Sequence, residues 1–259
     1  LGLVDPVDNL DPDRLDPKKL PAAPWTLQAT HPELLEKLAA EFVSNGTNLR
    51  EFIRLLVQSS AYQLSSRYDG EWKYEYVQLF ARHYPRRLMA EEVHDAVTLA
   101  TGISGQYTYP IRNGQTLPRG TRPLPQSEPV TWAMQLPGPN EPGNNGNARN
   151  FMDSFLRGNR DTADRSNAGS IQQQLNLMND AFVNNRIRVT ASPVLRRIAS
   201  LPSNEEVLDE IFLTFLSRKP SPRERQAGIS FLEQAANRNE ALEDLAWVAI
   251  NKVDFLFSY

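Results

Sequence analysis

Five short helix-start signatures constrain the fold of this chain more than any other feature of its sequence. In each signature a Ser, Thr or Asn stands three residues before a Glu or Gln, the pair whose side chains can cap the first turn of a helix. The signatures begin at Thr30, Asn48, Ser170, Ser203 and Ser221. Apolar residues recur at helical spacing after each of them. Because these local signals agree along most of the chain, they predict a mainly α fold.

Further helices are predicted from periodicity and from stop signals. Residues 74–83 form an apolar-periodic run that ends before Pro85, and residues 89–101 form another that is followed by Gly102. A short helix is expected to start at Ser192-Pro193, and a long one is expected over residues 239–257. We therefore expect an orthogonal multi-helix bundle.

A long irregular insertion interrupts the helical pattern. Residues 102–150 contain eight prolines and seven glycines, which is incompatible with long helices. Asn113-Gly114 is typical of the turn of a β-hairpin, and residues 130–136 are expected to form another short strand. We expect an arm or linker at residues 1–29, which repeat Asp-Pro pairs, and a single helical domain at residues 30–259 that contains this insertion.

Composition excludes several classes of function. The net charge of −3 offers no basic surface for nucleic acid, so we expect no nucleic-acid partner. The absence of cysteine excludes disulfides, thiolate metal sites and covalent haem attachment within the chain. No run of eighteen apolar residues exists, so we expect no insertion of this chain into a membrane. The sequence starts without Met, and we expect any targeting signal to lie upstream.

One helix carries the densest group of ionisable candidates. Glu91, His94 and Asp95 stand at positions i, i+3 and i+4, where they could face a shared ion. Di-iron bundles use Glu-x-x-His twice, with further glutamates on partner helices, whereas this chain has the motif once. We therefore predict no metal site and expect a polar helix face paired with Arg86 or Arg87. The binding candidates in this segment are Arg86, Arg87, Glu91 and His94.

No catalytic residue can be assigned from motifs. The sequence contains neither the Gly-x-Ser-x-Gly turn of α/β-hydrolases nor a glycine-rich phosphate-binding loop. We therefore expect no cofactor and favour a protein that is not an enzyme. Carboxylate-pair chemistry stays open, because Asp161 and Asp164 lie between Arg160 and Arg165, although such alternating charges more often form ion pairs with one another.

Aromatic residues of the insertion form a second set of candidates. Tyr107, Tyr109 and Trp132 could stack on the rings of a sugar or on a peptide. The interpretation that we favour is that they fasten the long loop to the helical body. Long loops are often functional, so glycan binding or hydrolysis at the insertion is the alternative function.

Several stretches together resemble a known family. They include Tyr84-Pro-Arg-Arg-Leu-Met-Ala-Glu91 and residues 49–66, 209–225 and 244–257, and the opening residues 2–8 resemble the entry segment of that family. The family is the C-terminal module of planctomycete-type bacterial surface proteins, known as domain of unknown function 1553 or planctomycete surface domain 1. The resemblance covers nearly the whole chain, with its motifs in family order.

The resemblance implies a domain arrangement and a cellular location, but it does not imply a specific activity. Parent proteins of the family carry an upstream domain, often a c-type cytochrome-like segment before it, and an export signal. It therefore implies a non-catalytic helical structural or interaction module of an exported protein, in the periplasm or at the cell surface, whose partners are the upstream domains of the same polypeptide. A role as accessory to the cytochrome domain is a further alternative. Family members commonly place cysteines where this chain has residues 160–166, so a metal or disulfide held there elsewhere in the family is not implied here.

Overall fold

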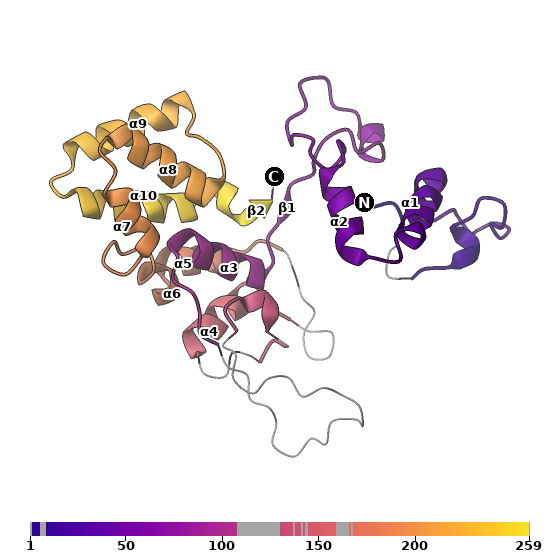
Figure 1. Cartoon of the computed structure of the whole chain (residues 1–259), viewed down its shortest axis with the longest axis horizontal. Coiled ribbons are helices and arrows are strands. Elements are labelled where there is room, and N and C mark those ends of the chain that lie inside the picture. Colours follow the sequence, from indigo (N-terminus) through magenta and orange to yellow (C-terminus); the bar gives the residue numbers. More distant parts are fainter. Residues whose placement is uncertain are drawn as a thin grey trace, which may run out of the picture. The chain divides into compact units, whose positions relative to one another are not determined.

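The computed structural model describes residues 2–5, 9–107, 130–136, 138–140, 142, 145–158, 166 and 168–258. Its residues form two compact units, one within residues 1–85 and the other over Arg86–Ser258. The described part is mainly α-helical, as predicted, with one short two-stranded sheet (Figure 1). No helix in the described ranges is long and apolar enough to cross a bilayer.

The first unit contains two helices, α1 (Pro32–Ser44) and α2 (Leu49–Gln58), with short 3₁₀ turns η1 (Pro12–Arg14) and η2 (Tyr74–Val77). The rings of Phe42 and Phe52 pack across the two helices with their centroids 5.1 Å apart. No residue of α1 or α2 is buried. Before α1, an isolated antiparallel bridge pairs the backbone of Val4 with that of Ala29.

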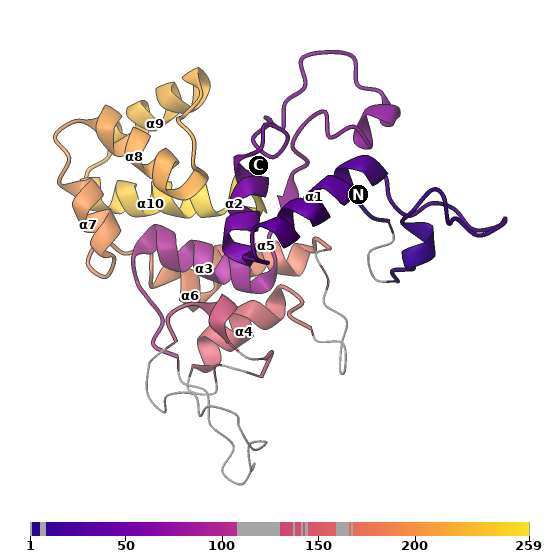
Figure 2. The ribbon, with the colours of Figure 1, turned by 45° about the vertical axis from the view of Figure 1, so that its right-hand side comes forward.

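The second unit contains the remaining helices (Figure 2). Their bounds are α3 (Ala90–Thr101), η3 (Ala133–Gln135), α4 (Gly146–Ser154), α5 (Ile171–Asn179), α6 (Ala181–Asn184), α7 (Pro193–Ala199), α8 (Asn204–Leu216), α9 (Pro222–Gln234), α10 (Arg238–Ile250) and η4 (Val253–Leu256). The buried apolar residues of the hydrophobic core lie almost entirely in this unit. Helix α3 contacts α4, α7, α8 and η3, so it is central to the unit. Its apolar face buries Val93 and Val97 completely. Strand β1 (Arg86–Arg87) pairs antiparallel with β2 (Phe257–Ser258), which joins the beginning of the unit to its end.

Four of the five predicted helix-start residues cap helices. The side chains of Asn48, Ser170, Ser203 and Ser221 each accept a hydrogen bond from the backbone N–H three residues later. The prediction for Thr30 was wrong, because its hydroxyl donates to the carbonyl of Gly2 and α1 starts without a side-chain cap. The apolar positions after these caps are buried unequally: α8 buries Val207, Ile211 and Phe215, whereas α2 buries no residue and Ile171 of α5 is 81% exposed.

Three element predictions were wrong. Residues 74–83 form only the short turn η2, because the chain reverses at Phe80, whose φ of 50° is left-handed. Residues 130–136 contain a single bridge at Val130, followed by η3, because Asp95 caps that turn. Helix α4 begins within the segment that was expected to be irregular.

Two further predictions concern segment ends. Helix α10 ends at Ile250 and not at residue 257, and η4 and β2 follow it. The hairpin predicted around residues 113–114 lies outside the described residues, but Tyr107 and Val130 on either side of it form an antiparallel bridge. The division of the chain at residue 30 stays a prediction.

Candidate functional site

A buried chain of hydrogen bonds runs through the middle of α3. His94 is completely buried, and its Nδ1 lies 2.8 Å from Oδ1 of Asp95. Its Nε2 lies 2.5 Å from the hydroxyl of Tyr107, whose side chain is also completely buried. A carboxylate only accepts hydrogen bonds, so Nδ1 carries the proton and Nε2 accepts the tyrosine hydroxyl. Both ring nitrogens of His94 are therefore used inside the fold.

Asp95 extends this chain to a distant segment. Its two carboxylate oxygens accept the backbone N–H groups of Ala133 and Met134, at 2.7 and 3.1 Å. These donors open the turn η3, where a carboxylate satisfies N–H groups that have no partner within the turn. The side chains of Asp95, His94 and Tyr107 thus fasten residues 107 and 133–134 to α3. Tyr107 fastens the base of the insertion to the helical body, which is the structural role considered for the insertion aromatics.

The electrostatics of this cluster favour neutral groups. Burial lowers the pKa of His94, although the hydrogen bond with Asp95 opposes the shift. Burial raises the pKa of Tyr107 to about 12. The guanidinium of Arg186 lies 3.8 Å from the ring centroid of Phe182, and that ring packs on the imidazole of His94 at 4.7 Å. A carboxylate, a histidine and a hydroxyl in series can form a nucleophile, but a buried tyrosine with a raised pKa stays protonated and out of reach of a substrate.

A second buried contact involves Glu91. Its Oε1 accepts a hydrogen bond from Nε of Arg157 at 2.9 Å, and both side chains are almost completely buried. The same guanidinium donates to the carbonyls of Gly138 and Pro139, at 2.8 and 3.3 Å. Glu91 and His94, which the sequence suggested could face one ion, therefore have different partners. Arg157 was not singled out in the sequence, because its partner is 66 positions away.

The other candidates from the sequence fall into two groups. Arg86 forms a bidentate ion pair with Glu92, as expected for a polar helix face. Its Nη2 lies 2.6 Å from Oε1 and its Nη1 lies 2.8 Å from Oε2. The backbone of Arg87 pairs with that of Phe257, and burial lowers the pKa of its guanidinium. Trp132 is half-buried directly before η3. The remaining candidates lie outside the described residues: Tyr109, Arg160, Asp161, Asp164 and Arg165.

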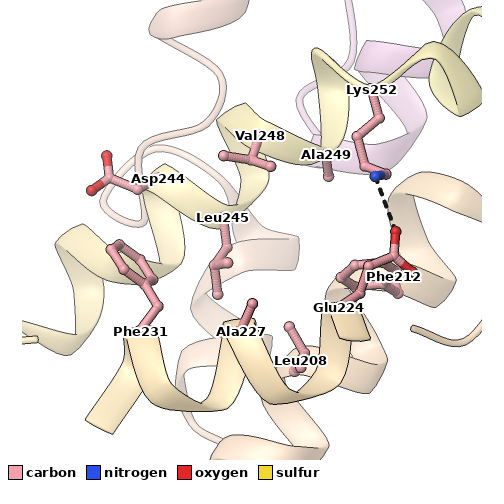
Figure 3. Close-up of a pocket in the computed structure, with 11 residues that line it drawn as sticks. Leu208, Phe212, Glu224, Ala227, Phe231, Asp244, Leu245, Val248, Ala249 and Lys252 are labelled. Carbon is pink, nitrogen blue, oxygen red and sulfur yellow. Dashed lines mark ion pairs between the residues drawn. The ribbon is translucent and has the colours of Figure 1, made fainter. Parts of the chain in front are cut away.

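An apolar pocket lies among α8, α9 and α10 (Figure 3). Its volume is about 280 Å³, and Phe231, Leu245 and Val248 are among the residues that line it. Phe231 and Val248 are 43% and 48% exposed, which is high for large apolar side chains. At one end, Nζ of Lys252 pairs with Oε1 of Glu224 at 3.0 Å. The pocket can accept an apolar side chain, and the ion pair can orient a polar group beside it.

No cluster of three or more His, Asp or Glu residues in the described part of the chain has the geometry of a metal site. The family model described as "PSD1: Protein of unknown function (DUF1553)" matches residues 26–232. The match confirms the resemblance inferred from the sequence. No curated protein matches the chain, and no solved structure matches it.

Proposed function

This chain belongs to the DUF1553 family of proteins of unknown function, and we propose that it is a non-catalytic helical structural and interaction module of an exported multidomain bacterial protein. The observation that carries the proposal is the engagement of His94. Its ring is completely buried, and both nitrogens are hydrogen-bonded to side chains of the same unit. The histidine in the densest ionisable segment of the sequence therefore holds the fold together.

The same conclusion extends to the neighbouring candidates. Glu91 is paired with Arg157, and Arg86 is paired with Glu92. A general acid or base has to reach the proton that it transfers, within hydrogen-bond distance of a substrate. Glu91 is buried and bonded to Arg157, so it does not meet this requirement, and the exposed Arg86 is held in an ion pair with Glu92.

The interaction part of the proposal rests on the apolar pocket of α8, α9 and α10. Large apolar side chains that stay exposed around a pocket are typical of a surface that another protein covers. Phe231 and Val248 have this character, on two different helices. We propose that the partner is a domain upstream in the same polypeptide, which places an apolar side chain between them.

Site-specific photo-crosslinking in the full-length parent protein tests this proposal. A photoreactive amino acid at position 231 is expected to crosslink to an upstream domain. The same group at position 99 is the control, because Leu99 is 68% exposed and does not line the pocket. Equal crosslinking from both positions, or none from position 231, would contradict the proposed interface.

A separate assay tests the non-catalytic part. The purified chain is expected to release no product from panels of ester and glycoside substrates. Turnover that is lost in a folded His94→Gln variant would overturn the proposal, because the buried imidazole would then take part in chemistry.

A further inference from the structure

Aromatic residues are concentrated near the end of the first unit. Seven of the 23 residues from 62 to 84 are Phe, Trp or Tyr, compared with 9% of the whole chain. Three of these rings surround Trp72 nearly edge-on: those of Tyr68, Tyr76 and Tyr84, with centroids 5.2, 5.7 and 6.0 Å from that of Trp72. The concentration therefore reflects a single packed cluster, which we call the Trp72 cluster.

Arg82 stacks on this cluster. Its guanidinium carbon lies 4.2 Å from the ring centroid of Trp72 and 5.3 Å from that of Tyr84. Contact with two rings holds the planar guanidinium in place through cation–π attraction and stacking. The orientation of the charged group is therefore fixed before any ligand arrives.

The hydrogen-bond donors of this arrangement are unused. The side chain of Arg82 forms no hydrogen bond or ion pair within the described ranges, and its Nε is buried. The hydroxyl of Tyr84 is likewise buried without a partner. The terminal nitrogens Nη1 and Nη2 of Arg82 are not among the buried atoms, so they are the donors that the acceptors of a ligand can reach.

Other arginines of the chain show what the missing partner is. Arg86 and Arg218 each bind a glutamate through two guanidinium nitrogens, at 2.6–2.9 Å. The fork of N–H groups on a guanidinium matches the two oxygens of a carboxylate. Arg82 has the same fork, held by two rings, but no carboxylate. The chemistry of the site thus favours a ligand with a carboxylate group.

The surroundings indicate what carries that carboxylate. Tyr68 of the cluster is 39% exposed, and Tyr74, which lies between Trp72 and Tyr76 in the sequence, is 84% exposed. Exposed aromatic rings offer flat apolar faces with a polar tip, which suit the C–H face and hydroxyl groups of a sugar ring. Residues 1–85 hold 12 acidic and 9 basic side chains, so they offer no basic surface that would bind a nucleic acid through many phosphates.

We propose that Arg82, held by the rings of Trp72 and Tyr84, forms a binding site for a sugar that bears a carboxylate, of the uronic acid class. The carboxylate lies against the guanidinium of Arg82, and the sugar ring packs on the exposed ring of Tyr68. This site lies in the first unit and not in the insertion where the sequence placed its aromatic candidates. The proposal does not depend on the proposed interface of α8, α9 and α10.

Calorimetry with the complete 259-residue chain tests the site. The probes are trigalacturonic acid and its carboxyl-reduced neutral counterpart. The acidic trisaccharide is expected to bind saturably, and the neutral one at least tenfold more weakly. Equal binding of both would overturn the role of the carboxylate, and an absence of binding to both would overturn the site.

Matched variants locate the binding. Arg82→Gln is expected to weaken the acidic trisaccharide at least tenfold, whereas Arg67→Gln, which removes one exposed positive charge from the same segment, changes its affinity by less than twofold. Equal losses in both variants would indicate general charge attraction and overturn the site.

A further variant keeps the test valid if Arg82→Gln fails to fold. Tyr84→Leu removes one of the two rings that hold the guanidinium of Arg82 and is expected to weaken binding by about threefold. Unchanged binding in a folded Tyr84→Leu would remove that residue from the site. An acetylated tetra-alanine peptide with a free carboxyl terminus is the last probe, and tighter binding of this peptide than of the trisaccharide would overturn the choice of a sugar.

Discussion

Replacing Tyr107 with phenylalanine tests directly whether the buried hydrogen bonds of α3 hold the fold together. The change removes the hydroxyl that lies 2.5 Å from Nε2 of His94. The ring itself is retained, and its centroid lies 5.5 Å from that of His94, so little packing is lost and no large cavity forms. The cost is that of a completely buried acceptor without a donor, about 2 kcal/mol. For a domain of this size the loss corresponds to about 4–8 °C in Tm.

Two measurements check the size and the place of this effect. Urea unfolding followed by far-UV circular dichroism gives the change in the free energy of unfolding. Hydrogen exchange of the amides of α3 shows whether the loss occurs in the unit that contains Tyr107. Tyr74→Phe is the control, because this residue is 84% exposed and its hydroxyl has no buried partner to lose.

The control variant is expected to change the free energy of unfolding by less than about 0.5 kcal/mol. If Tyr107→Phe changed it equally little and left the exchange of α3 unaltered, the hydrogen bond to His94 would not stabilise the fold. A structural role of His94 would then be refuted.

Three further predictions follow from the second unit. Burial lowers the pKa of His94, so the unfolded chain binds a proton at a higher pH than the folded chain, and the free energy of unfolding measured in urea should fall as the pH drops from 7 to 5. His94→Gln should flatten that slope, and an unchanged slope would contradict the assignment. Glu91→Ala should lower the free energy of unfolding by about 3–5 kcal/mol, because it removes the buried acceptor that lies 2.9 Å from Nε of Arg157. A double-mutant cycle with Arg157→Met should give a coupling energy above about 1 kcal/mol, and additive losses would show that the pair is not coupled. Gly102→Ala should lower Tm, because Gly102 has a φ of +68° and a new Cβ would lie 2.8 Å from the side chain of Val194. Gly146→Ala, where a Cβ meets nothing within 4 Å, is the matched control, and equal Tm values in the two variants would contradict the argument.

The helices could be predicted from the sequence because their start signals are local. A capping side chain and the N–H that it binds are three residues apart, as at Ser203 and Glu206. The left-handed glycine after α3 is equally local, since Gly102 directly follows the helix that it ends. Signals of this range are visible in one sequence without any knowledge of tertiary contacts.

The partners of the ionisable residues could not be predicted in the same way. Asp95 binds backbone groups 38 and 39 positions away, and Glu91 binds an arginine 66 positions away. Only the packing of α3 against η3 and α4 brings these groups together. The sequence indicated that Glu91 and His94 could share one face of a helix, but not that each would find a partner in a different segment.

In residues 74–83 the local pattern predicts a helix, but a tertiary contact prevents it. The apolar spacing predicts a helix, yet aromatic and β-branched residues form helices weakly, and the contact of Arg82 with Trp72 requires the chain to turn back. Phe80 makes that turn with a left-handed backbone. The tertiary contact that is inconsistent with a helix over 74–83 is therefore the same contact that builds the proposed sugar site.

The sugar site that we propose does not coincide with the highest density of charged residues in this chain. Arg86 lies in the segment of highest charge density, and its fork is filled by Glu92 of the same unit. Arg82 lies at the edge of that segment, where acidic residues are fewer, and within the described ranges its fork has no acceptor. Opposite charges close together in the sequence tend to satisfy one another on folding, whereas a guanidinium held by aromatic rings keeps its donors for a ligand. The arginine to test for binding is therefore the one whose nearest neighbours are aromatic rings.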